Sequence, residues 1–271
     1  MLRKTLLSVA LLTATFCLTL AHEFWIYPTQ FFVKVGEQLT FTINVGEDYM
    51  GERWGGGSRR VERLRHISTQ EETDLTAKIQ QDDSLVTPPS LTVGQAGTHI
   101  VALETNSSFI ELEPKKFLEY LKEDGLTNAI SYRQKNGETQ KNGRELYRRC
   151  AKTLVQVGET SDANALKNTG MALEIIPLTN PYSLPKGQPL ACQFLFEGKP
   201  LKNALVRCWR RVNGKTELEL KQSDAQGKAT FDLPRKAKAA YMVSVVTMQR
   251  LSENPRADWQ STWGSMTFGM K

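Results

Sequence analysis

The chain contains three histidines, and the first of them stands where an exported protein would begin. Cleavage of an amino-terminal signal peptide after Ala21 would leave His22 with a free α-amino group. That amine has a reference pKa of about 8, and together with one imidazole nitrogen it can chelate a metal ion from a single residue. Such nitrogen ligands suit nickel, copper and zinc. His22 is therefore the leading candidate for a metal ligand.

Completing such a site takes one or two further ligands, and His66 and His99 are the other histidines. In a strand, His99 would lie on the same face as neighbouring apolar residues, so a buried structural role is an alternative to metal binding. Glu47 and Asp48 follow a predicted strand directly, where oxygen ligands commonly lie, although a solvated loop tip explains them as well. We predict a divalent transition-metal site formed by His22, His99 and His66.

No catalytic motif accompanies these histidines. The sequence has no Gly-x-Ser-x-Gly, no His-Glu-x-x-His and no glycine-rich phosphate loop. We therefore predict a binding protein rather than an enzyme. A copper enzyme with a histidine-brace centre, which also begins at a processed histidine on a β-sandwich, stays open as an alternative if a second histidine lies against the first.

A third possibility is a non-catalytic envelope interaction or carbohydrate-binding module in which His22 is incidental. Five tryptophans could stack on sugar rings in such a module, although tryptophans more often fill sandwich cores: Trp25, Trp54, Trp209, Trp259 and Trp263.

Residues 1–21 are typical of a signal peptide. Arg3 and Lys4 precede an apolar run at 6–20 that is short for a membrane span, and small side chains precede the expected cleavage site. Cys17 could instead carry a lipid, but the bulky Phe16 makes a poor lipobox. We expect a periplasmic protein without membrane insertion after processing, because no later stretch is long and apolar enough to span a bilayer.

Charge argues against nucleic acid as a partner. Loss of Arg3 and Lys4 with the signal peptide lowers the formal net charge from +6 to +4, and basic and acidic residues are interleaved. The dense basic spots, at 59–60 and 207–211, lack the aromatic or glycine framework of a nucleic-acid-binding module.

The patterning predicts a mainly β protein made of two β-sandwich domains with a short helical insertion. In residues 38–45, apolar side chains occupy one face and polar side chains the other, which is the period of a strand. Residues 22–157 are predicted to form the first sandwich. Helical spacing and Pro114 predict a helical segment over 114–156 within it.

Residues 158–170 are polar and are predicted to link the two domains. Short strands return over 171–271, where Asn213-Gly214 between two strands is a strong hairpin signal. Three cysteines follow the signal peptide, at 150, 192 and 208, so at most one disulfide forms within the chain. Cys192 and Cys208 lie on consecutive predicted strands and could form it.

Two segments of the second half, 198–206 and 223–234, resemble prealbumin-like, carboxypeptidase-regulatory-type sandwiches. A wider pattern runs along nearly the whole mature chain, and its parts are residues 21–25, 45–47, 51–52, 110–112, 117–125, 143–147, 173–177, 180–182 and 259–268. Together they resemble a bacterial periplasmic family of unknown function that is often described as a periplasmic component of nickel/cobalt uptake.

The resemblance implies a periplasmic binding protein for a divalent transition metal, nickel or cobalt, accessory to metal uptake. The partners it implies are the metal ion or a metal chelate and a membrane metal transporter. Copper remains a possible ion from the donor chemistry alone, because copper binds nitrogen ligands more tightly than nickel or cobalt does.

Overall fold

The computed structural model describes residues 23–79, 90–185, 187–234 and 238–271. The predicted signal peptide, its cleavage site, Cys17 and His22 lie outside the described residues. Among the residues described, most lie in strands, and the prediction of a mainly β, sandwich-like protein is confirmed.

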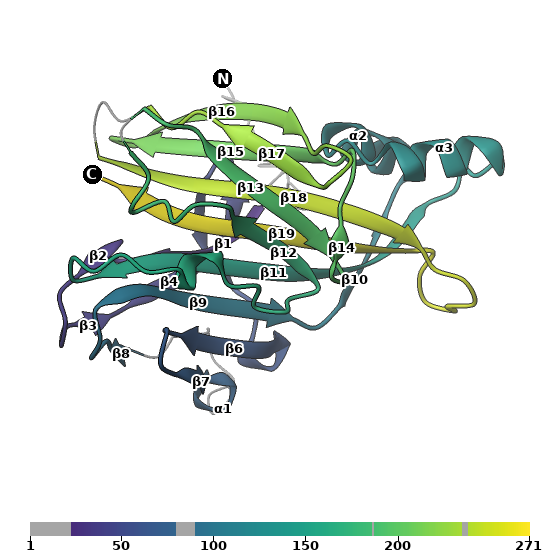
Figure 1. Cartoon of the computed structure of the whole chain (residues 1–271). Helices are drawn as coiled ribbons and strands as arrows, with labels where there is room; N and C mark the ends of the chain where they lie inside the picture. Colours follow the sequence, from purple (N-terminus) through teal and green to yellow (C-terminus); the bar gives the residue numbers. More distant parts are fainter. Residues whose placement is uncertain (1–22, 80–89, 186, 235–237) are drawn as a thin grey trace, which may run out of the picture.

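A ten-stranded sheet runs through the whole molecule (Figure 1). Eight strands follow one another across it, and two short ones pair with β11 outside this path. In spatial order the eight are β16 (Lys215–Gln222), β15 (Leu205–Val212), β18 (Ala239–Arg250), β19 (Trp259–Met270), β11 (Gly143–Val157), β9 (Gly97–Thr105), β6 (Val61–Ile67) and β7 (Glu72–Asp74). The two short ones are β10 (Ser108–Leu112) and β2 (Phe32–Val33).

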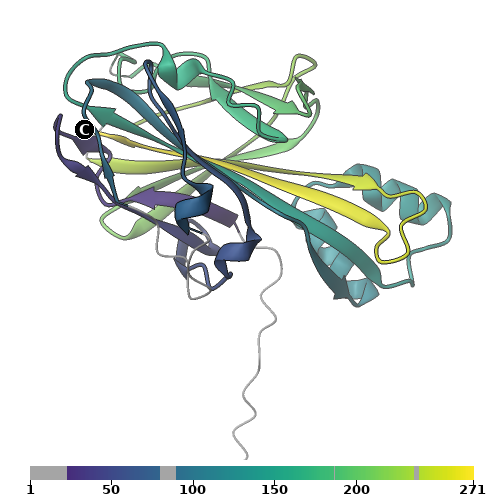
Figure 2. The same cartoon turned by 90° about the horizontal axis from the view of Figure 1, so that it is seen from below.

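Smaller sheets cover the two faces of this large sheet, as Figure 2 shows with purple strands on one side and green on the other. The first consists of β1 (Glu23–Pro28), β4 (Phe41–Glu47) and β5 (Met50–Arg53). The second consists of β12 (Leu173–Pro177), β13 (Leu190–Phe196), β14 (Lys199–Pro200) and β17 (Lys228–Phe231). Each buries its apolar face against the large sheet, which gives two separate cores. A pair of short strands, β3 (Gln38–Leu39) and β8 (Leu91–Thr92), extends the first layer.

Helices α2 (Pro114–Glu123) and α3 (Thr127–Lys135) confirm the first part of the predicted helical segment. Phe117 and Leu121 of α2 are fully buried and pack with Trp259 over the ends of β18 and β19. Short helical turns occur at η1 (Ser58–Arg60), α1 (Thr76–Ile79) and η2 (Asn164–Leu166). None of the helices in the described ranges is long and apolar enough to cross a membrane.

The prediction of a helix over 144–156 is wrong, because these residues form β11, a strand of 15 residues. Apolar residues at i, i+4 and i+8 suggested a helix, but every residue from Arg149 to Val157 is buried. A strand covered on both faces lacks the alternation by which strands are recognised in a sequence. Its parallel pairing with β19 and antiparallel pairing with β9 place it in the middle of the large sheet.

The predicted hairpin at Asn213-Gly214 is confirmed. β15 and β16 pair in register up to Val212 and Lys215, and both turn residues have positive φ, 49° and 75°. Strands from both sides of 158–170 share the large sheet. That residues 158–170 link two domains, each of which folds by itself, stays a prediction.

All three described cysteines are buried free thiols. Cys192 lies on β13 and Cys208 on β15, in two sheets that face each other rather than on neighbouring strands, so the suggested disulfide is not formed. Burial raises the pKa of Cys150 and of Cys192 to about 12, which makes both thiols unreactive at neutral pH.

An ion pair between Lys152 and Glu174 joins the large sheet to the four-stranded sheet, and both side chains are buried, at 0% and 1% exposure. The Glu174 carboxylate also accepts hydrogen bonds from the Thr169 hydroxyl, at 2.6 Å, and from the amides of Thr169 and Met171, both at 3.2 Å. The buried charges are therefore compensated by several donors, as a buried pair requires.

We predict that Glu174→Ala lowers the free energy of unfolding by about 3–5 kcal/mol, because it leaves the Lys152 ammonium buried without a partner. The double variant Lys152→Met/Glu174→Leu should be much closer to the wild type. Urea denaturation measures both, with Glu197→Ala as the control, since Glu197 is exposed and the loss of its pair with Arg148 should cost no more than about 1 kcal/mol. Equal stability of Glu174→Ala and the wild type would contradict the prediction.

Candidate metal centre

The structure brings two of the three predicted metal ligands, His66 and His99, into direct contact. β6 and β9 are antiparallel and pair His66 with Val101 and Ile67 with Ile100. His99 therefore lies diagonally across from His66 on the same face of the sheet, within reach of it. Nε2 of His66 is 2.8 Å from Nδ1 of His99, and the two rings stack with centroids 5.0 Å apart.

The surrounding backbone fixes which nitrogen carries the proton. Nε2 of His99 lies 3.0 Å from the carbonyl oxygen of Gln95, which can only accept a hydrogen bond. In the neutral ring Nε2–H therefore donates to Gln95, and Nδ1 is the acceptor for Nε2–H of His66. Metal-binding histidines are commonly oriented by such a hydrogen bond from the second ring nitrogen to a carbonyl.

Both rings are poor bases in this position. Burial and, to a smaller extent, the neighbouring His99 together lower the pKa of His66 to about 4, and the charge of Glu71 only partly opposes them. Burial also lowers the pKa of His99, which has 2% of its surface exposed. Both imidazoles are therefore neutral at pH 7, the protonation state that binds metal.

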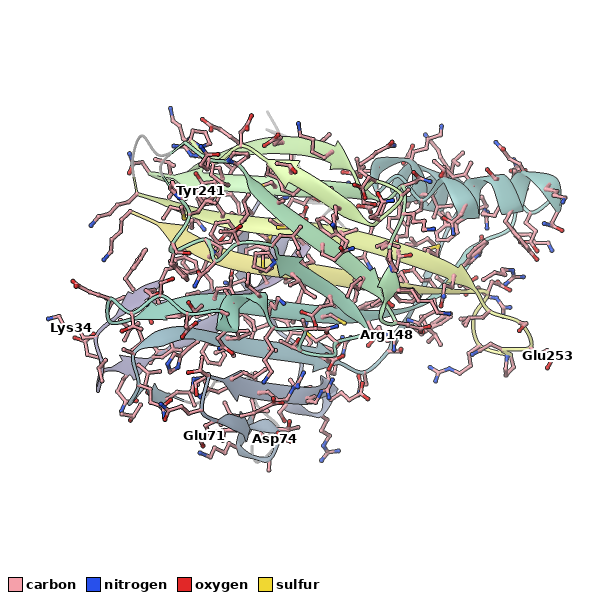
Figure 3. All side chains as sticks on the ribbon, in the orientation of Figure 1. Lys34, Glu71, Asp74, Arg148, Tyr241 and Glu253 are labelled. Carbon is pink, nitrogen blue, oxygen red and sulfur yellow. The ribbon has the colours of Figure 1, made fainter. Side chains whose placement is uncertain are left out.

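A cavity of about 520 Å³ opens beside the pair at the edge of the large sheet. Its lining is mostly polar and includes Ser68, Thr73 and the oppositely charged Glu71 and Lys78. Figure 3 shows Glu71, just before β7, and Asp74, the last residue of β7, at this edge. In the parts of the chain that the structure describes, no group of three or more His, Cys, Asp or Glu could hold a metal. The described residues therefore offer two ligands, and water can fill the remaining positions.

The two nitrogens fit a shared metal ion. Because metal–imidazole bonds are about 2.0–2.1 Å long, two ligating nitrogens can be at most roughly 4 Å apart. The 2.8 Å between Nε2 of His66 and Nδ1 of His99 meets this limit. Binding would require His66 to move its proton from Nε2 to Nδ1, a change of tautomer that leaves the ring neutral. The two rings would also have to turn, so that the lone pairs now aligned along the hydrogen bond both point at the ion.

Asn164 fixes the two strands at the positions next to the histidines. Its buried amide donates to the carbonyl oxygens of Thr98, at 2.6 Å, and Ile67, at 3.1 Å. Thr98 precedes His99 and Ile67 follows His66, so one side chain sets the spacing of both. The sequence did not indicate that Asn164 and Gln95 support the histidines. Asn164 lies in the segment predicted to be a linker. Gln95 acts through its backbone carbonyl, which any residue type would provide.

A model of one protein family matches residues 19–249, and its description is "Domain of unknown function (DUF4198)". The chain belongs to this family. A comparison with curated proteins finds no match. The description of the DUF4198 family names no ligand or activity.

The third predicted ligand, His22, lies outside the described residues, but its neighbours on β1 can be placed. The Ser265 hydroxyl donates to the Phe24 carbonyl at 2.6 Å, and Ser265 pairs with Ala151 of β11. His99 pairs with Val155, four residues further along β11 and so about 13 Å away at ~3.3 Å per residue. β1 approaches that end of β11 only as it runs on from Phe24 to Ile26, whose carbonyl accepts a hydrogen bond from Thr267, the partner of Thr153. The amino-terminal chelate is therefore a separate prediction.

Glu23, the residue after His22, lies in a largely buried place. Trp209 Nε1–H donates to its carboxylate at 3.0 Å, and burial raises the pKa of Glu23 although Arg207 opposes the shift. Glu47 ends β4 and Asp48 begins the turn to β5; both are exposed, and Asp48 has φ 55°. These two carboxylates lie at a loop tip and do not line the cavity beside the histidine pair.

The five tryptophans of this DUF4198 chain do not form a sugar-stacking platform. Their exposed fractions lie between 1% and 8%, and they fill the cores: Trp25, Trp54, Trp209, Trp259 and Trp263.

We predict that NMR titration of the metal-free protein finds His66 neutral at pH 5.5 and His99 protonated on Nε2 only. Since the folded-state pKa of His66 is about 4 and the unfolded value about 6.5, the unfolded chain takes up a proton first as pH falls. The free energy of unfolding should therefore decrease from pH 6.5 to pH 4, and less steeply in His66→Gln. A His66 resonance that titrates near pH 6.5 would contradict this assignment.

Proposed function

We propose that this DUF4198 protein is a periplasmic binding protein for a divalent transition metal, and that His66 and His99 bind the ion. Nickel or cobalt is the expected cargo, and a membrane metal transporter is the expected recipient. Both expectations come from the family resemblance of the sequence and from its signal-peptide-like start.

The observation that carries this proposal is the pair of imidazole nitrogens 2.8 Å apart beside a polar cavity. Binding an ion would change the tautomer of His66 and turn the two rings, but not move their backbones, because the sheet and Asn164 already hold these in place. Its neutral rings need not lose charge to bind, since the Nε2 proton of His66 only has to move to Nδ1 of the same ring. Two protein ligands plus water also leave open coordination positions, which suits a carrier that must release its ion.

A purely structural role for the pair explains the same hydrogen bond less fully. Buried polar groups are normally paired, and a His–His bond could serve only that purpose. However, both histidines line a polar cavity, and other polar side chains could satisfy a hydrogen bond at these two positions. Metal binding, in contrast, requires nitrogen ligands at both positions and so explains why both residues are histidines.

The test is calorimetry with nickel, cobalt and copper on chains that begin at His22. Because loss of a supporting hydrogen bond alone costs about 10–100-fold in metal affinity, loss of a ligand should cost at least as much. We predict that His66→Gln and His99→Gln each weaken nickel binding by about tenfold or more. His22→Ala should retain one bound metal, and cobalt should bind more weakly than nickel or copper.

Gln95→Ala is the matched control, since it changes a residue of the same cavity but keeps the backbone carbonyl that orients His99. It should bind metal like the wild type. If His22→Ala alone abolishes binding, the amino-terminal chelate is the site and the pair is not. If neither class of variant changes binding, or the wild type binds nothing below about 0.1 mM, the metal proposal fails and the interaction-module alternative takes its place.

A further inference from the structure

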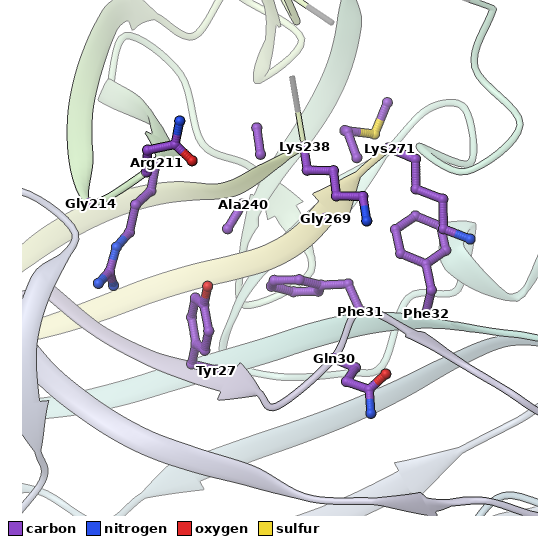
Figure 4. Close-up of a pocket in the computed structure, with 13 residues that line it drawn as sticks. Tyr27, Gln30, Phe31, Phe32, Arg211, Gly214, Lys238, Ala240, Gly269 and Lys271 are labelled. Atoms are coloured by element: carbon purple, nitrogen blue, oxygen red, sulfur yellow. The ribbon is translucent and has the colours of Figure 1, made fainter. Parts of the chain in front are cut away.

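A second cleft, of about 600 Å³, lies where β1, the turn after β15 and the ends of β18 and β19 meet (Figure 4). Its size lies within the usual range of ligand pockets, about 300–1,000 Å³. None of its residues lines the cavity beside the histidine pair. The cleft is therefore a separate candidate site.

Aromatic rings form one wall of the cleft. Tyr27 and Phe31 meet edge to face with centroids 5.5 Å apart, and Phe32 extends the row beyond them. All three rings are half-buried, so one side of each stays accessible. Such rings offer flat apolar surfaces with a negative face, against which the C–H groups of a sugar ring can pack.

The aromatic wall is held rigidly. Phe31 lies directly on Gly269 of β19, where an added Cβ would come within 2.5 Å of the Phe31 Cβ. The Phe31 carbonyl accepts a hydrogen bond from the backbone N–H of Gln156 at 2.9 Å, which connects this segment to β11. Glycine at 269 thus lets the Phe31 ring reach the floor of the cleft. A ligand would meet a preformed surface, which reduces the entropy cost of binding.

Cationic side chains surround these rings, and no described residue of the lining is acidic. The Arg211 guanidinium lies 5.9 Å from the Tyr27 ring centroid, and Lys271 Nζ lies 4.1 Å from that of Phe32. Figure 4 shows Lys238 and Lys271 extending over the Phe31–Phe32 side, with Arg211 at the opposite side. A ligand in this cleft would therefore meet positive charge at both ends, and Arg211 can bind a carboxylate through two parallel hydrogen bonds.

Neutral amides complete the rim. Gln30 and Asn213 are exposed at the cleft, and each side chain offers both a donor and an acceptor. Hydroxyl groups, which also donate and accept, match this pattern. Flat rings, cations and amides together correspond to the ring, the carboxylate and the hydroxyls of one class of ligand.

We propose that this cleft binds an acidic saccharide, with its carboxylates between Arg211 and Lys238 and a sugar ring against Tyr27 and Phe31. A neutral sugar would leave the cations unused, and a simple anion would leave the aromatic wall unused. This proposal is independent of the metal site.

The probe is trigalacturonic acid, compared with its methyl ester, which keeps the rings but removes the charge. NMR titration of the labelled protein should place the shifts at Tyr27, Phe31 and Gly269, and the acid should bind at least tenfold more tightly than the ester. Arg211→Gln and Lys238→Gln should each weaken binding of the acid about tenfold. Lys115→Gln, the same kind of change at an exposed position on α2, should leave it unchanged.

Equal binding of acid and ester, or no binding of either at 10 mM, would overturn the proposal. So would an equal loss in Lys115→Gln and Lys238→Gln, since it would reduce the effect to net charge. Because Arg211→Gln could disturb the hairpin, Phe31→Leu serves as a second variant: it keeps an apolar side chain over Gly269 and should weaken binding of both the acid and the ester.

Discussion

The pairing of β11 with β19 on one side and β9 on the other is the interaction on which the rest of this structure depends. The parallel β11–β19 pairing joins residues more than a hundred positions apart, from Glu145 with Trp259 to Thr153 with Thr267. β11 contributes to both cores, with Leu154 on one face and Val155 on the other. Without this strand the two halves of the chain would have no common sheet.

The candidate metal centre follows from that arrangement. β9 is fixed along one edge by β11 and carries β6 on its other edge, and the histidine pair spans the β9–β6 boundary. Asn164, from the segment that connects β11 to β12, then binds the backbone beside each histidine. The site is therefore built by long-range sheet pairing and one side-chain clamp, and it owes nothing to local sequence motifs.

This origin explains what could be predicted from the sequence and what could not. Local signals were sufficient for α2, α3 and the Asn213-Gly214 hairpin, because a proline, helical spacing and a turn dipeptide determine those elements nearby in the chain. They were insufficient for β11, whose two buried faces remove the alternation of a strand. Residue type alone made His66 and His99 candidate metal ligands, but only the register of β6 and β9 makes them neighbours. The placement of His22 and of the domain boundary stays a prediction.

The most direct test of the metal proposal is anomalous diffraction from crystals of the protein grown with cobalt. We predict an anomalous peak about 2.0–2.2 Å from Nε2 of His66 and Nδ1 of His99, with Nε2–H of His99 still bound to the Gln95 carbonyl. A second peak at the amino terminus would be compatible with it. A cobalt peak elsewhere while His66 and His99 remain hydrogen-bonded to each other would contradict it.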